Sequence, residues 1–355
     1  MRRIALLIGF LLAAVTGAHA QWQMEDSTTT ADLRGIDSVG GGIAWASGTN
    51  GTVVRTEDGG YEWQPCAIPP GAEHLDFRGI QAFDANTAIV MSSGKGDLSR
   101  LYKTTDGCQT WKLIFTNPDK GGFWDAVLLN RFDKDGELLG DPVNGQFAFW
   151  QTSDKGVTWE RTSLRGLEAL KDEGAFAASN SSLFEDERFA TGFVTGGLTG
   201  ARIFISEDTA EDGEFTAHPL PLGNHSESGG GFSIDDRDWC CWVVVGGDYT
   251  KPNDSARTAA YTHDGGKTWH TAQMPPHGYR SSVAYDAAKV WITVGPNGTD
   301  ISTDDGRNWR AVHPDAALHE APDADRNWNA LSLPFVVGPH GRIGKLDAQA
   351  LTAAH

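Results

Sequence analysis

Short apolar runs alternate with glycine-rich turns along most of the chain. In residues 33–68 four such runs follow one another: LRGIDSV, GIAWASG, GTVVRTE and YEWQPCAI. Runs of this length, rich in Val, Ile, Thr and Trp and bounded by turn residues, predict β-strands. Four strands in succession predict an antiparallel meander, the blade of a β-propeller. Because long amphipathic helical patterns are absent from the sequence, we expect an all-β fold.

An eight-residue segment recurs between the third and fourth runs of these units. It reads TEDGGYEW in residues 56–63, and further copies start about 40 to 56 residues apart at Thr104, Thr152, Ser206, Thr262 and Ser302. The Asp carboxylate can accept backbone N–H groups in a tight turn, the Gly supplies a positive φ, and the Trp ring covers the turn. We call these segments Asp boxes and expect structural roles for Asp58, Trp63, Asp106, Trp111, Asp154, Trp159, Asp208, Asp264, Trp269, Asp304 and Trp309.

A seventh unit follows the sixth Asp box, in residues 328–347, but it offers only three strands. Residues 21–27, QWQMEDS, are similar to the fourth strands of the other units. We therefore predict that this N-terminal strand completes the last blade, which gives seven blades in a closed ring and leaves no exposed sheet edge.

The repeated segments resemble the Asp boxes, or bacterial neuraminidase repeats, of known β-propellers. Units ending in T-x-D-G-G-x-x-W are similar to those of the photosystem II stability/assembly factor family, and the resemblance covers the chain after residue 20. It implies a seven-bladed propeller that acts as a non-catalytic scaffold and holds other proteins during assembly. Asp boxes also occur in sialidases, xyloglucanases and sortilin-type receptors, so the resemblance specifies the fold more narrowly than the activity.

The first twenty residues have the pattern of a secretory signal peptide. Two arginines precede an apolar run over residues 4–15, and the small-residue sequence AHA ends at Ala20. We predict a signal peptide over residues 1–20, cleaved after Ala20, and one propeller domain over residues 21–355 in the periplasm or outside the cell. No later stretch approaches the roughly 20 apolar residues of a membrane helix. No Cys follows the cleavage site to carry a lipid.

Composition narrows the choice of partners. The formal net charge of -18 disfavours nucleic acid, since a polyanion repels phosphate backbones. Neither HExxH nor CxxC spacing occurs, so we predict no metal site and no cofactor.

The four cysteines leave the disulfide pairing open. Cys240 and Cys241 are adjacent in an apolar run, where successive side chains of a strand point to opposite faces, so we expect two buried thiols.

One face of such a propeller is the candidate binding surface. We expect the Asp boxes on one face of the ring and the longer insertions in loops on the opposite face. Loops held by a rigid scaffold can present variable residues to a partner. Three units begin their first strand with an Arg after an aromatic residue or Leu: Arg34, Arg78 and Arg280. Forked Arg donors suit a carboxylate or phosphate. Alternatively, each Arg pairs with an acid such as Asp76 or Asp125 and holds adjacent blades together.

The same rim is expected to carry Asp141, Glu173, Ser228, Asp248 and Tyr249. With the arginines, these residues predict a site for a protein partner or for a small anionic or glycan ligand.

A glycoside hydrolase is the alternative interpretation of this rim. Glycosidase chemistry needs one protonated and one ionised carboxyl group across an open site. Asp141, Glu173 and Asp248 are the candidate carboxylates, and Tyr249 or Tyr279 is the candidate nucleophile of a sialidase-like reaction. The Arg-Ile-Pro start of sialidases is missing, and those enzymes have six blades, so we favour the non-catalytic interpretation.

Overall fold

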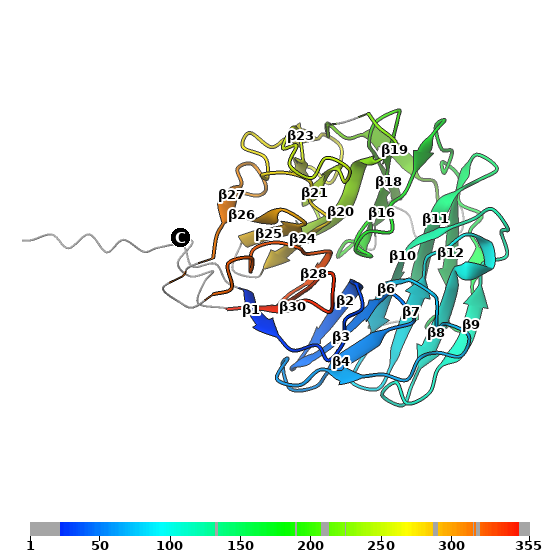
Figure 1. The fold of residues 1–355 in the computed structure, drawn as a ribbon. Coiled ribbons are helices and arrows are strands. Elements are labelled where there is room, and N and C mark those ends of the chain that lie inside the picture. Colours follow the sequence, from blue (N-terminus) through cyan, green and yellow to red (C-terminus); the bar gives the residue numbers. More distant parts are fainter. Residues whose placement is uncertain are drawn as a thin grey trace, which may run out of the picture.

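The computed structural model describes residues 22–347, with gaps at residues 132–133, 189, 207–212, 224, 287–289, 315 and 317–319. The described residues form seven antiparallel β-sheets arranged as the blades of a propeller. In Figure 1 the colours run once around the ring, and the first strands of the blades, such as β2, β6, β10 and β24, lie toward its centre. The prediction of a seven-bladed all-β propeller is confirmed.

The first three blades are four-stranded meanders in chain order. Blade 1 contains β2 (Leu33–Gly40), β3 (Ile43–Gly48), β4 (Val53–Thr56) and β5 (Gln64–Pro65). Blade 2 contains β6 (Phe77–Ala82), β7 (Ala88–Ser92), the short 3-10 helix η1 (Gly96–Leu98), β8 (Arg100–Thr104) and β9 (Lys112–Thr116). Blade 3 contains β10 (Trp124–Leu129), β11 (Gly136–Val143), β12 (Gln146–Thr152) and β13 (Glu160–Arg161).

Blades 4 to 6 repeat this order with one addition. Blade 4 contains β15 (Leu183–Glu185), β16 (Thr191–Val194), β18 (Arg202–Ser206) and β19 (Thr216–Pro219). Blade 5 contains β20 (Gly229–Asp238), β21 (Cys241–Asp248), β22 (Ala259–Thr262) and β23 (His270–Thr271), and its sheet is extended by β14 (Glu173–Gly174) and β17 (Gly196–Gly197). Blade 6 contains β24 (Ser282–Asp286), β25 (Val290–Gly295), β26 (Gly298–Ser302) and β27 (Arg310–Val312).

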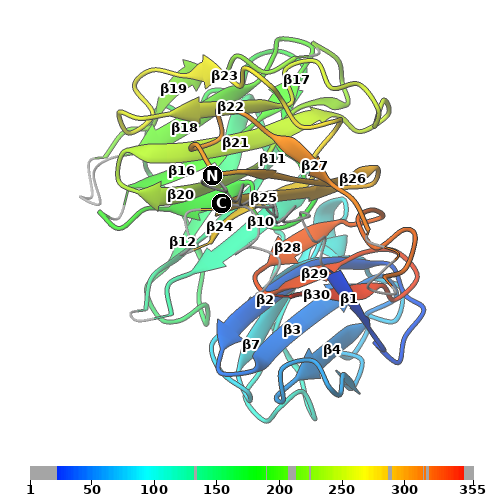
Figure 2. The ribbon, with the colours of Figure 1, turned by 90° about the vertical axis from the view of Figure 1, so that its left-hand side faces the viewer.

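Blade 7 combines strands from both ends of the described chain. It contains β28 (Ala330–Ser332), β29 (Phe335–Val337) and β30 (Ile343–Leu346), and β1 (Trp22–Glu25) pairs antiparallel with β30. Blue β1 lies beside red β30 in both ribbon views (Figure 2). Trp22 is buried against Trp328, and its indole N–H donates to Thr299 Oγ1 at 3.1 Å in blade 6. The first described strand therefore packs against residues from two blades.

The Asp boxes form the turns between the third and fourth strands. In blade 1 the Thr56 hydroxyl donates to Asp58 Oδ1 at 2.9 Å, and the Gly60 and Glu62 N–H groups donate to Thr56 Oγ1 and Asp58 Oδ1. The same bonds recur in the boxes of blades 2, 3, 5 and 6. These hydrogen bonds lower the pKa of Asp58 because they stabilise the carboxylate. The box of blade 4, which starts at Ser206, is longer than the others, and its Asp208 lies outside the described residues.

The Trp residues of the boxes divide into two groups. The indole N–H groups of Trp159, Trp269 and Trp309 donate to the carbonyl oxygen of the box Gly at 2.9–3.2 Å. The indole nitrogens of Trp63 and Trp111 make no hydrogen bond within the described residues. All five rings are at least half-buried, so each covers its turn as the sequence predicts.

Apolar side chains of neighbouring blades share the core. One cluster joins Trp45 and Val53 of blade 1 to Phe77, Ile80 and Tyr102 of blade 2. Another joins Ile36 and Trp63 of blade 1 to Phe335 and Ile343 of blade 7. Burial of apolar area stabilises a protein by about 25 cal/mol per Å². Apolar burial therefore holds these blades to the blades beside them.

Candidate functional site

A cavity of about 540 Å³ lies on the face opposite the Asp boxes. Each first strand runs from this face to the face of the boxes, so the cavity is lined by residues at the starts of these strands and in the adjoining loops. The lining residues include Arg34, Arg78, Phe123, Asp125, Asp141, Phe176, Phe232, Tyr249, Tyr279, Ser281, Trp328 and Asn329. All seven blades, or the connections that lead into them, therefore contribute to one site.

Four of the lining side chains are placed by irregularities in strand pairing. The register of the first strand shifts between Leu33 and Gly35 in β2, and equivalent shifts occur in β6, β10 and β20. A β-bulge leaves one residue outside the ladder and re-aims its side chain. The residues skipped in this way are Arg34, Arg78, Asp125 and Phe232, all of which line the cavity.

The two arginines share one acidic neighbour. Arg78 Nε donates to Asp76 Oδ2 at 2.8 Å, and its Nη1 donates to the carbonyl oxygen of Ala177 at 3.1 Å. Arg34 Nε lies 3.9 Å from Asp76 Oδ1 and makes no hydrogen bond within the described residues. The side chains of Arg34 and Arg78 remain 31% and 30% exposed. Two guanidinium groups with one counter-charge leave donors available for an anionic group.

Two carboxyl groups stand beside the arginines. Burial and the neighbouring Asp141 raise the pKa of Asp125 well above its usual value, although Arg78 opposes this shift. Burial also raises the pKa of Asp141 to about 6, against a hydrogen bond from the Ala175 N–H at 3.1 Å. The raised pKa of Asp125 disfavours its ionised form, whereas Asp141 is mostly ionised at neutral pH. The positive charge of the arginines is only partly cancelled.

An aromatic wall faces these charged groups. Phe176 stacks on Phe232 with ring centroids 4.0 Å apart, and Tyr279 meets Phe232 edge to face at 4.8 Å. Tyr249 lies at 6.2 Å from Phe232 and is 52% exposed. Burial raises the pKa of Tyr279 far above its usual value, so its hydroxyl stays protonated. Aromatic rings beside charged donors suit a ligand that has both apolar and anionic groups.

Arg280 does not line the cavity, although the sequence groups it with Arg34 and Arg78. Its side chain is 1% exposed and ion-pairs with the buried carboxylate of Asp300, while its Nη1 donates to Asn297 Oδ1 and the Tyr279 carbonyl oxygen. The pairing of β24 begins two residues later, at Ser282, and has no bulge at its start. For Arg280 the structure agrees with the alternative interpretation, an Arg that pairs with an acid, although that acid is neither Asp76 nor Asp125.

Glu173 and Asp248 are also held away from the cavity. The Glu173 carboxylate accepts bonds from Arg202 Nε at 2.8 Å and from Thr195 Oγ1 at 2.7 Å. Asp248 is fully buried and accepts hydroxyl groups from Ser226, Ser228 and Thr250 at 2.6–3.0 Å. Burial alone would raise the pKa of Asp248, but the bonds from Thr250 and Ser228 outweigh it and lower the pKa. These carboxylates are satisfied inside the protein, and Ser228 belongs to the same internal network.

The catalytic set of the hydrolase alternative is therefore not assembled. Of its five candidate residues, Asp141, Tyr249 and Tyr279 line the cavity, whereas the carboxylates of Glu173 and Asp248 do not. The other carboxyl group of the lining, Asp125, is not one of these candidates; it is 1% exposed, and burial raises its pKa. The lining of the cavity includes neither His nor Cys, the residues that most often hold transition metals.

Sequence reasoning missed the aromatic lining residues Phe123, Phe176, Phe232 and Trp328. Phe232 stands in GGFSI, which reads as turn glycines followed by a strand. Its position could have identified it, because Phe232, like Arg34 and Arg78, lies in the first half of the first strand of its blade.

The fold and this cavity define a class, the seven-bladed propellers that carry a cationic and aromatic cavity opposite their Asp boxes. In the part of the chain that the structure describes, no helix has the length and hydropathy needed to cross a bilayer. No protein-family model matches the chain.

Two curated relatives share a name. The photosystem II assembly lipoprotein Ycf48 of Synechococcus sp. (strain CC9902) is 24% identical over 306 residues, which cover 83% of this chain and 79% of the relative. The protein of the same name from Picosynechococcus sp. (strain ATCC 27264 / PCC 7002 / PR-6) is 26% identical over 362 residues, which cover 99% of this chain and 94% of the relative. The resemblance to photosystem II assembly-factor propellers is confirmed.

Solved structures share the architecture. The structure of YCF48 bound to D1 peptide has a TM-score of 0.64 at 17% identity and covers 92% of this chain and 97% of that one. YCF48 from Cyanidioschyzon merolae has a TM-score of 0.61 at 17% identity, with coverage of 93% and 100%. The GH74 xyloglucanase of Xanthomonas campestris has a TM-score of 0.60 at 13% identity, with coverage of 93% and 54%. At these identities the likeness shows the fold alone.

Proposed function

We propose that this protein is an exported, non-catalytic propeller that binds a segment of a protein partner in the cavity opposite its Asp boxes. The observation that carries the proposal is the pair of bulges that present Arg34 and Arg78 beside an aromatic wall. The arginines bind a carboxylate of the partner, either a side chain or a chain terminus, and the rings of Phe232 and Tyr249 contact apolar side chains next to it.

A peptide fits this site better than a glycan substrate does. The cavity holds an apolar wall, and two of the three candidate carboxylates of a hydrolase, Glu173 and Asp248, are bonded internally. A propeller of the same architecture is described as YCF48 bound to D1 peptide, which supports a peptide as the kind of ligand. Assembly of a larger protein complex is the role that the two curated relatives suggest.

The place of action that we propose is outside the cytoplasm. The pattern of residues 1–20 supports export, and the two relatives are named lipoproteins, which are exported or membrane-associated. In this chain Gln21 follows the expected cleavage site where a lipoprotein would have Cys, so we propose that export here does not depend on a lipid at that position.

A pull-down with matched variants tests the binding role. The bait is the purified chain, either wild type, R34A/R78A or R165A, and the prey is an extract of exported proteins from the source organism. Arg165 is the control because its side chain is exposed and its ion pair is with the exposed Glu214. We expect the R34A/R78A bait to recover at least tenfold less of one partner than the other two baits. Equal recovery by all three baits would contradict the proposal.

A further inference from the structure

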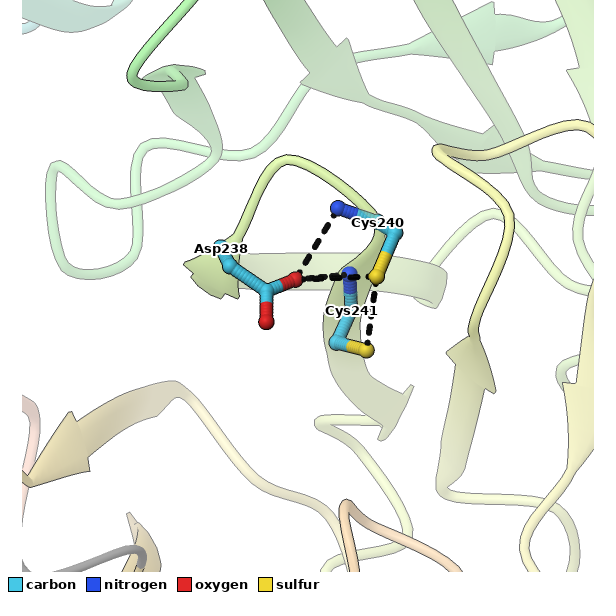
Figure 3. A group of neighbouring side chains, drawn as sticks. All are labelled: Asp238, Cys240 and Cys241. Atoms are coloured by element: carbon cyan, nitrogen blue, oxygen red, sulfur yellow. Dashed lines mark hydrogen bonds between the residues drawn. The ribbon is translucent and has the colours of Figure 1, made fainter.

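Three metal-ligating side chains meet on the Asp-box face of blade 5. Cys240 Sγ lies 3.2 Å from Cys241 Sγ and 3.0 Å from Asp238 Oδ1, and the three ligand atoms all lie within 4.8 Å of one another (Figure 3). Both thiols are free, Cys241 is buried and Cys240 is half-buried. This group lies across the molecule from the cavity of Arg34 and Arg78, because the hairpin between β20 and β21 is on the face of the boxes.

The hairpin explains why two adjacent cysteines point together. Asp238 is the last residue of β20, Cys241 is the first residue of β21, and Cys240 stands in the turn between them. The N–H groups of Cys240 and Cys241 both donate to Asp238 Oδ1 at 3.0 Å, which closes the turn. The alternation of side chains that the sequence led us to expect applies within a strand, and Cys240 precedes the strand. Both are free thiols, as expected, but only Cys241 is buried.

A histidine from the neighbouring Asp box adds a further donor. His263 is exposed, and its Nδ1 lies 3.4 Å from Cys241 Sγ. The Gly265 N–H of the same box donates to the Cys240 carbonyl oxygen at 3.1 Å, so the two turns are tied together. The two sulfur atoms and the carboxylate oxygen therefore form one compact group, and the imidazole of the adjoining turn contacts this group through Cys241 Sγ. Cys and His in such a set favour zinc-type ions over magnesium or calcium.

An arginine stands behind the sulfur atoms. Arg237 Nη2 donates to Cys241 Sγ at 2.8 Å, its Nη1 binds both oxygens of Asp305 at 2.8 and 2.9 Å, and its Nε donates to Asp238 Oδ2 at 3.1 Å. Such outer partners orient metal ligands and tune their charge. A divalent ion with two thiolates and one carboxylate carries one net negative charge, and the Arg237 guanidinium, which it would share with Asp305, lies beside that charge.

We propose that Asp238, Cys240, Cys241 and His263 form a binding site for a thiophilic divalent cation of the Zn²⁺ type. Zn–S bonds of about 2.3 Å place two thiolates on a tetrahedral ion about 3.8 Å apart, so the sulfur atoms need to separate by only about half an ångström. Each thiol gives its proton to solvent as its sulfur binds the ion, and no oxidant or reductant takes part. The site is independent of the partner-binding cavity and does not require that function.

Cobalt substitution tests the site directly. The full-length processed chain is kept in tris(2-carboxyethyl)phosphine, freed of metal and titrated with Co²⁺, which gives thiolate charge-transfer bands and intense visible bands only when sulfur ligands hold it near-tetrahedrally. The reductant can also open the Cys66–Cys108 disulfide, so the C240S and C241S variants assign these bands to Cys240 and Cys241. We expect one Co²⁺ per chain, displaced by an equal amount of Zn²⁺.

Variants identify the ligands. C240S and C241S should each abolish the charge-transfer bands, and H263Q should weaken Zn²⁺ binding at least tenfold. H270Q is the matched control, because His270 is another exposed His of blade 5 and lies outside the group. Circular dichroism on every variant separates loss of the site from loss of the fold, and H263Q keeps the proposal falsifiable if a Cys variant does not fold.

Three outcomes would overturn the proposal. The first is the absence of charge-transfer bands in a chain whose two thiols react with a thiol reagent. The second is Co²⁺ or Zn²⁺ binding that is unchanged in C240S and C241S, which would mean an adventitious ion only. The third is a Cys240–Cys241 disulfide that persists in reductant, because it would leave no thiolates for the metal.

Discussion

Cys66 and Cys108 form a disulfide between the end of the fourth strand of blade 1 and the Asp box of blade 2. In that box Cys108 occupies the position of the Gly of the other boxes and has a φ of 61°. A non-glycine residue with a positive φ costs free energy, so the box of blade 2 gives up the best residue for the turn in exchange for a covalent link to its neighbour. The sequence left this pairing open.

Removal of this disulfide should destabilise the whole ring. The two cysteines are 42 residues apart in sequence, and cross-links that close loops of this size contribute about 2–4 kcal/mol by restricting the unfolded chain. We expect C66S/C108S to lower the free energy of unfolding in urea by that amount. C240S/C241S, which removes no disulfide, is the control, and all chains are unfolded in a chelator so that no bound metal contributes. An unfolding curve for C66S/C108S that coincides with wild type would contradict this role.

The buried ion pair of Arg280 and Asp300 should matter for stability. R280M leaves the Asp300 carboxylate buried without its guanidinium partner, and removal of one partner of a buried pair costs about 3–5 kcal/mol. R165A, which breaks the exposed pair with Glu214, should cost less than about 1 kcal/mol. Urea unfolding of both variants decides this. Similar losses for both would mean that Arg280 is not the internal link described here.

Trp22 should hold the last blade together. Its ring is buried between blades 6 and 7, and replacement of a large buried aromatic residue by Ala typically costs about 3–5 kcal/mol. M24A is the matched control, because Met24 lies in the same strand and is 40% exposed. We expect W22A to lower the thermal unfolding midpoint far more than M24A does. Equal shifts would show that β1 contributes little to the closed ring.

Ionisation of Asp141 should cost stability. In the folded protein burial raises its pKa from 3.8 to about 6, so the folded state holds a proton that the unfolded chain releases at lower pH. Wild-type stability should therefore fall relative to D141N as the pH rises from about 4 to about 6, and the difference should then stay constant. The shift corresponds to a difference on the order of 3 kcal/mol. Urea unfolding at several pH values tests this, and a difference that does not change with pH would refute it.

The repeated part of the fold could be predicted from the sequence because every Asp box carries its own turn chemistry. Thr56, Asp58 and Gly60 act within a few residues of one another, so their spacing in the sequence already specifies their hydrogen bonds. The same applies to the seventh blade, whose strands repeat the apolar pattern of the others.

The site could be predicted only in part, because bulges and burial are not local. Arg78 and Arg280 stand in similar sequences, FRGIQAFD and YRSSVAYD, yet only the strand of Arg78 has a bulge at its start. An acid near the rim is available to a ligand only if no residue far away in the sequence already pairs with it. Glu173, for example, pairs with Arg202. The thiols of Cys240 and Cys241 meet because a turn ends one residue later than the apolar pattern suggests.

Photo-crosslinking from the two faces of blade 5 tests the partner-binding site most directly. Benzoylphenylalanine replaces either Tyr249, which lines the cavity, or Trp239, which stands on the Asp-box face. The two side chains are similarly exposed, Tyr249 at 52% and Trp239 at 48%. The account predicts a crosslinked partner from position 249 that disappears in the R34A/R78A background, and none from position 239. A crosslink from position 239 alone, or one from position 249 that persists without the two arginines, would contradict it.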